Sequence, residues 1–128
     1  MTAFGKKPLL PFFLENHLNE ILFTTEINVF ELYLGLYSSK QLNENSQLLN
    51  QRKNRLEEFL TKFQILPFSR HEAIVSAKIL GQLFRVGQPV EFRDCLIAGT
   101  ALANGINSII TKNVNHFQRM PGITVVLY

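Results

Sequence analysis

Three oxygen-bearing side chains of this 128-residue chain lie within or next to apolar segments, where a polar side chain indicates a structural or functional role. Glu31 lies inside the apolar segment 29–36, Asp94 opens a run of small and apolar residues, and Asn113 follows the apolar run that ends at Thr111. Carboxylate and amide oxygens suit Mg²⁺ or Mn²⁺, which keep several waters and share the rest of their shell with a phosphate. Such ions activate water and stabilise the charge on a scissile phosphodiester, so the residues suggest metal-assisted hydrolysis.

Simpler roles for the same residues remain open. An ionised carboxylate is costly to bury unless it is paired, so Glu31 could instead face solvent on a narrow stripe or form a salt bridge with an arginine. Asp94 could interact only with the positive end of its own helix. The three histidines, His17, His71 and His116, are scattered and are interpreted as surface or capping residues.

Composition and motifs exclude several other classes of protein. The chain has no His/Cys cluster with zinc spacing, no P-loop, no G-x-G-x-x-G and no serine elbow. A net charge of +3 and a pI near 9.2 are compatible with an anionic partner such as RNA. The one cysteine, Cys95, favours a reducing cytoplasm. No apolar run is long enough to span a membrane, and the N-terminal LLPFFL run is not expected to be a secretory signal.

The positions of the polar residues depend on alternating strands and helices. We expect strands at 21–25, 64–68, 106–111 and 123–128, and helices at 26–38, 47–63, 70–85 and 93–104. Gly105 is expected to end the last of these helices in a left-handed conformation, and Ser69–Glu72 has the form of a capping box. Apolar strands separated by helices are typical of a parallel sheet that is covered on both faces, here as one α/β domain.

In such folds ligands bind where the carboxyl ends of strands meet the following loops. Glu31 lies on the helix after the first expected strand, Asp94 at the start of a later helix, and Asn113 just after a strand. We therefore expect all three to meet at one edge of the sheet.

Four sequence blocks, in this order, carry a resemblance to a known family: EINVFELYLG, RDCLIAGTALANG, IITKNVNHF and a final PGI. From about Phe13 to the C-terminus the chain resembles the PIN-domain family, and within it the small toxins of the VapBC toxin–antitoxin type. The resemblance implies a three-layer α/β sandwich with a mostly parallel central sheet and helices on both faces. It also implies a cytoplasmic endoribonuclease that depends on Mg²⁺ or Mn²⁺.

The resemblance assigns roles by position. Glu31 matches the second acid of the family, in its E-L-x-x-G motif, and Asp94 matches the acid before the I-A pair. Asn113 stands where the family has asparagine or aspartate after the strand threonine, Thr111. Glu91, one turn before Asp94, would be a further metal ligand.

The same resemblance implies partners. RNA would be the substrate, with Thr111, Lys112 and Arg85 as its candidate contacts. A homodimer is expected, together with a cognate antitoxin, and no membrane is involved. Apolar residues near the N-terminus and in the FELYLGLY helix would form the interface.

The chain departs from the family at its beginning. PIN domains open with a central strand that carries D-T or D-S and supplies the first metal-binding aspartate, whereas this chain begins MTAFGKKPLLPFF. Either the strand is encoded upstream, or the chain, 1–128, is a shortened PIN domain, or MTAFGKK replaces the strand; we favour the first two accounts over the third. Without that strand a gap is expected between strands 21–25 and 106–111, which those two strands would close by pairing directly or another segment would fill.

Two functions therefore stay open: a ribonuclease weakened or inactivated by the loss of one acid, and a non-catalytic PIN scaffold that binds an antitoxin or another PIN subunit. A third account, an α/β protein that shares only the packing pattern, is the least favoured because the motif blocks occur together and in order.

Overall fold

The computed structural model describes residues 22–88, 91–111, 117–118 and 120–127. The predictions for Lys112 and Asn113, and for His17 and His116, fall outside these residues. The described elements follow the order β1 (Phe23–Thr25), α2 (Glu26–Ser38), α3 (Lys40–Asn43), α4 (Ser46–Leu60), β2 (Gln64–Leu66), α5 (Arg70–Arg85), α6 (Phe92–Ala103), β3 (Ser108–Thr111) and β4 (Thr124–Leu127). None of the helices in this part of the chain combines the length and hydropathy needed to cross a membrane.

All strand pairs in the described residues are parallel, as the sequence predicts. β1 pairs with β2 in the register Phe23↔Gln64, and β3 pairs with β4 in the register Ser108↔Thr124. Within the described part these pairs form two separate two-stranded sheets rather than one sheet. Direct pairing of β1 with β3, one of the two ways expected to close the gap, is therefore not seen among these residues.

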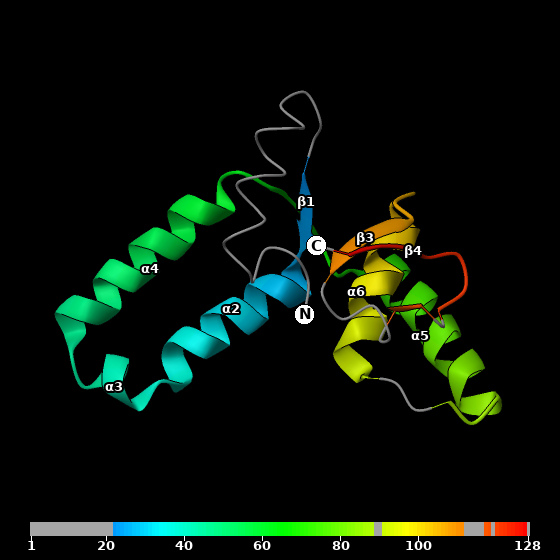
Figure 1. Ribbon diagram of the computed structural model, residues 1–128, viewed down its shortest axis with the longest axis horizontal. Coiled ribbons are helices and arrows are strands. Elements are labelled where there is room, and N and C mark those ends of the chain that lie inside the picture. The colour runs from blue at the N-terminus through cyan, green and yellow to red at the C-terminus, as the bar shows by residue number, and fades with distance from the viewer. Residues whose placement is uncertain (1–21, 89–90, 112–116, 119, 128) are drawn as a thin grey trace.

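Helices α2, α3 and α4 form an arm that extends away from α5 and α6 (Figure 1). α2 begins at Thr25, whose hydroxyl accepts a hydrogen bond from the Asn28 backbone N–H at 3.2 Å. The segment expected to be a loop contains the short helix α3, because Ser39 caps its start by accepting from the Leu42 N–H. Asn45 caps α4 in the same way. Such caps satisfy backbone donors that a helix start leaves unpaired.

Helices α5 and α6 pack closely against each other and against β3 and β4. The predicted capping box at the start of α5 is present, and Gly105 after α6 has the predicted positive φ of 75°. Gly99 allows the close approach of the two helices, since a Cβ added there would lie 2.6 Å from the Ser76 Cα. The main core contains the buried residues Ile79, Leu83, Cys95, Ile97, Ala98, Ile109, Phe117 and Met120.

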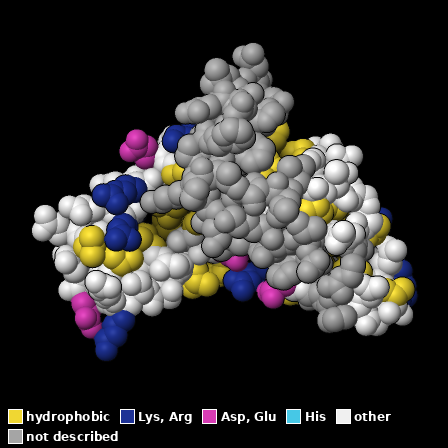
Figure 2. Space-filling model, viewed as in Figure 1, with side chains coloured by type: hydrophobic (Ala, Val, Ile, Leu, Met, Phe, Trp, Pro, Cys, Tyr) yellow, Lys and Arg dark blue, Asp and Glu magenta, His cyan; other side chains and the backbone are white. Residues whose placement is uncertain are grey.

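One side of α2 is exposed, within the FELYLGLY segment that is expected to form an interface. Phe30, Leu34 and Tyr37 are 60%, 45% and 51% exposed. They recur at helical spacing and so share one side of α2. Figure 2 shows hydrophobic side chains gathered on the surface of the arm, beside basic ones. The arm projects away from α5 and α6, so these helices do not cover this side of α2.

Candidate functional site

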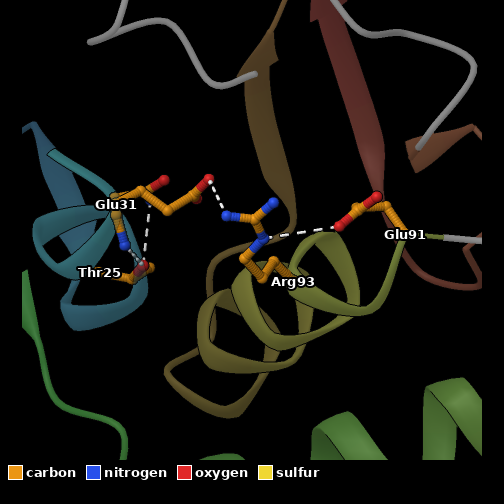
Figure 3. Close-up of polar contacts among 5 residues, drawn as sticks. Thr25, Glu31, Glu91 and Arg93 are labelled. Atoms are coloured by element: carbon orange, nitrogen blue, oxygen red, sulfur yellow. Dashed lines mark hydrogen bonds and ion pairs between the residues drawn. The ribbon is translucent and has the colours of Figure 1, made fainter. Parts of the chain in front are cut away.

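The candidate site lies between α2 and the first turn of α6. β1 leads directly into α2, and Glu31 lies in the second turn of that helix. Glu91 is the residue that precedes the first turn of α6, and Asp94 lies within that turn. Figure 3 shows Glu31 and Glu91 on either side of the Arg93 side chain, which comes from α6.

Arg93 connects the two glutamates. One guanidinium nitrogen, Nη1, lies 3.4 Å from Oε2 of Glu31, and Nε lies 3.5 Å from Oε1 of Glu91. The Glu31 side chain is 20% exposed, whereas Arg93 and Glu91 are 47% and 49% exposed. The alternative that Glu31 forms a salt bridge with an arginine is thus confirmed. The sequence contains the R-D pair of this motif, yet nothing in its spacing showed that Arg93 would reach α2.

Glu31 and Asp94 interact through their charges. Burial is the main cause that raises the pKa of Glu31, and the negative charges of Asp94 and then Glu91 raise it further. The Arg93 guanidinium opposes these effects by lowering the pKa. Asp94 is only 7% exposed. The charges of Glu31 and Asp94 therefore act on each other from different helices, while the expected meeting of both residues with Asn113 lies outside the described residues.

This donor set fits a hard divalent cation. In the described ranges, no group of three or more His, Cys, Asp or Glu side chains is arranged to hold a metal ion. Mg²⁺, however, is commonly bound through one or two carboxylates, with waters and substrate phosphate completing its shell. The negative charges of Asp94 and Glu91 act on Glu31, and a bound cation would offset them as the Arg93 guanidinium does. Glu31 and Asp94 are the side chains that would hold the ion.

The other candidate residues lie in different settings. Thr111 ends β3 and its side chain is fully buried. Arg85 lies in the last turn of α5 and is exposed. His71 is exposed, as predicted for a surface residue.

A second carboxylate, Glu72, lies at the start of α5 and is 4% exposed. The Ser69 hydroxyl donates to Oε1 of Glu72, and the Ser69 backbone N–H donates to the same oxygen at 2.9 Å. The Asn104 amide, at the end of α6, donates to Oε2 at 3.1 Å. The hydrogen bonds from Ser69, with a smaller one from Asn104, lower the pKa of Glu72 to about 2. The sequence predicts the capping box but not the contact with Asn104.

Cys95 follows Asp94 and has no exposed surface. Burial, and then the charge of Asp94, raise the pKa of its thiol to about 11. A thiol in this state is not a nucleophile at neutral pH. The chemistry of the site therefore rests on its carboxylates.

A family model described as the PIN domain matches residues 10–123. The chain belongs to the PIN domain family. It is 30% identical over 101 residues to the tRNA(fMet)-specific endonuclease VapC of Salmonella typhimurium, covering 79% of this chain and 70% of that protein. It is 33% identical over 96 residues to the ribonuclease VapC of Rickettsia bellii, covering 75% of this chain and 68% of that protein.

A solved structure gives the same result for the fold. The DNA-bound VapBC structure from Salmonella typhimurium is similar with a TM-score of 0.80 at 25% identity, over 97% of this chain and 88% of that chain. The predicted PIN fold and the resemblance to VapC-type ribonucleases of toxin–antitoxin systems are therefore confirmed. PIN-domain nucleases of the VapC type generally depend on a divalent metal.

Proposed function

We propose that this chain is an endoribonuclease of the VapC type that hydrolyses RNA phosphodiesters in the cytoplasm with Mg²⁺ or Mn²⁺. The observation that carries the proposal is that Asp94, in the first turn of α6, acts by its charge on Glu31 of α2, while the neighbouring Arg93 joins the two helices by an ion pair with Glu31. These are the positions that match the family's acids. The membership of the PIN family and the similarity to VapC ribonucleases support the same activity.

The roles of the chain's own residues follow from their settings. Glu31 and Asp94 would hold the metal ion, and Glu91 would add negative charge at the edge of the site. A bound Mg²⁺ or Mn²⁺ supplies Lewis acidity that favours water deprotonation and stabilises charge on the phosphodiester. Asn113 would orient the attacking water or an ion ligand. Phosphate contacts are proposed for Arg85 and Lys112. Thr111, the third RNA contact expected from the sequence, has a fully buried side chain and would instead support the strand end.

Asp94→Asn tests the activity. The change keeps the shape of the side chain but removes its charge, so Mn²⁺ binding measured by calorimetry should weaken and cleavage of RNA should fall by about 100-fold. Glu58→Gln is the matched control, because Glu58 is an exposed acid on α4. Equal cleavage by the Asp94→Asn protein and the Glu58→Gln protein would contradict the proposal.

We further propose that the exposed side of α2 binds a protein partner. Similar solved structures are complexes named VapBC, which supports an antitoxin as one partner. The apolar stripe of Phe30, Leu34 and Tyr37 gives a surface that association would cover. In a homodimer, two-fold symmetry would place the same stripe on both subunits.

Light scattering tests the homodimer. We expect the purified chain to have the mass of a dimer and Leu34→Ser to shift it toward the monomer. Phe84→Ser is the control, since Phe84 is 68% exposed but lies on α5. A dimer unaffected by Leu34→Ser would show that this stripe is not the homodimer interface.

A further inference from the structure

Arg93 is the charged side chain at the site for which family resemblance assigns no role. It lies on α6 directly before Asp94, and its guanidinium reaches across to Glu31 of α2 (Figure 3). Its Nε is directed at Glu91 at the same time. One cationic group thus bridges two carboxylates from two segments that are far apart in the sequence.

The charges around Arg93 explain its position. Glu31 is affected by the negative charges of Asp94 and Glu91, and Arg93 is the described side chain that compensates them. Three carboxylates near one another are unfavourable unless a positive charge lies among them. Arg93 therefore supplies the compensation that a bound divalent cation would also supply.

The contacts of Arg93 are of a kind that can be exchanged. A single guanidinium nitrogen faces Glu31, at 3.4 Å, instead of the two parallel hydrogen bonds of a bidentate pair. The Arg93 side chain is nearly half exposed, so its own charge stays solvated when it turns away from Glu31. Glu31 is the more buried partner and keeps its place on α2.

We infer that Arg93 is an internal counter-ion that competes with the divalent cation for Glu31 and thereby sets the metal affinity of the site. The inference rests on the proposed function, because it takes Glu31 and Asp94 as the residues that hold the ion. Arg93 is on this account a positioning residue. It holds the Glu31 carboxylate in place before the ion binds, and its displacement is part of the cost of binding.

Calorimetric titration of Mn²⁺ into the full chain tests the inference. Arg93→Gln removes the competing charge, and Coulomb repulsion between a guanidinium and a divalent ion several ångströms away corresponds to an affinity gain of about threefold to tenfold. Arg93→Lys keeps a positive charge and should stay close to the unchanged protein. Arg52→Gln, an exposed arginine on α4, is the control for the loss of one positive charge.

Each outcome has a distinct meaning. Tighter binding by Arg93→Gln, with Arg93→Lys and Arg52→Gln unchanged, supports the inference. Equal binding by all four proteins would overturn it and leave the proposed function intact. Weaker binding by Arg93→Gln would also overturn it, because Arg93 would then assist the ion. If no protein of the set binds Mn²⁺, the inference and the proposed metal site fall together.

A second readout separates competition from a purely structural role. Melting temperatures are measured with a chelator and again with saturating Mn²⁺. Competition predicts that Mn²⁺ raises the melting temperature of Arg93→Gln more than that of the unchanged protein, since tighter binding to the folded state stabilises it more. An equal rise in the two proteins would count against competition.

Discussion

The two ends of α6 each meet a glutamate from another helix, with opposite results. At the N-terminal end, Asp94 and Arg93 face Glu31, whose pKa is raised by burial and by like charges. At the C-terminal end, Asn104 faces Glu72, whose pKa is lowered to about 2 by donated hydrogen bonds. The helix thus has one end where a glutamate lies among like charges and is held by an ion pair, and one where a glutamate is held by donated hydrogen bonds.

The difference separates a binding carboxylate from a structural one. Hydrogen bonds stabilise the charged form of Glu72, so it has no need of a further partner. The charged form of Glu31 is opposed by burial and by the charges of Asp94 and Glu91, and it is stabilised by the ion pair with the half-exposed Arg93. Clustered like charges of this kind are typical of sites that bind a ligand of opposite charge. Burial alone would not distinguish the two, because both side chains are largely covered.

Paired substitutions at the two ends provide the sharpest test, with the largest expected effect. Glu31→Gln should lower RNA cleavage by about 100-fold, because it removes a charge that holds the ion. Glu72→Gln should leave cleavage by the folded protein unchanged, because Glu72 is engaged with Ser69 and Asn104. Initial rates at saturating Mn²⁺ measure both. A comparable loss in the Glu72→Gln protein would break the distinction between the ends.

A substitution in the middle of α6 provides the next test, with an expected effect of intermediate size. Gly99→Ala places a Cβ 2.6 Å from the Ser76 backbone, so α6 must shift away from α5. We expect a loss of about 1–3 kcal/mol in the free energy of unfolding, measured with urea.

Gly81→Ala is the matched change on α5. The nearest atom there is the Arg85 guanidinium at 3.8 Å. The substitution should raise stability by about 0.5–1 kcal/mol, as for an alanine in an open helix position. If Gly99→Ala were as well tolerated as Gly81→Ala, the close contact of α5 with α6 would not be what sets the positions of the two ends of α6.

Acid titration gives the smallest effect. The folded-state pKa of Glu72 is lowered from 4.5 to about 2, so its contribution to stability is present above pH 4.5 and is lost as the pH falls toward 2. Glu72→Gln should lower the melting temperature by about 3 °C at pH 7. The gap between the two proteins should narrow between pH 4.5 and pH 2. The contribution of Glu31 to stability has the opposite sign: its raised pKa lowers stability at neutral pH, and this loss disappears when Glu31 is protonated. A constant gap across this range would show that the charge of Glu72 is not what stabilises the C-terminal end.

Local signals in the sequence predicted most of the elements. The capping box at Ser69–Glu72 and the glycine at 105 gave the limits of α5 and α6 to within about a residue, because caps and left-handed turns depend on neighbouring residues alone. α3 was missed, although Ser39 is a good capping residue, because the segment has too few apolar residues to show a helical period.

Contacts between distant segments were harder to predict. From the order of strands and helices the sequence predicts that Glu31, Asp94 and Asn113 meet at one edge. In the structure the charge of Asp94 acts on Glu31, and Asn113 lies outside the described residues. It could not predict that Arg93 reaches Glu31 or that Asn104 reaches Glu72, since both contacts depend on how α6 is rotated against its neighbours. The sequence predicts an interface on the FELYLGLY helix, but apolar residues all round a helix do not show which of its sides a second protein would cover.

The buried thiol of Cys95 can report how often the first turn of α6 opens. It lies beside Asp94, has no exposed surface and has a pKa raised to about 11, so a thiol reagent can modify it only after the first turn of α6 has separated from its surroundings. The rate of labelling would thus count the openings of this helix end, as amide exchange counts local unfolding. Because the chain has one cysteine, the labelling signal would come from that turn alone. A ligand that stabilises the closed site would lower the labelling rate.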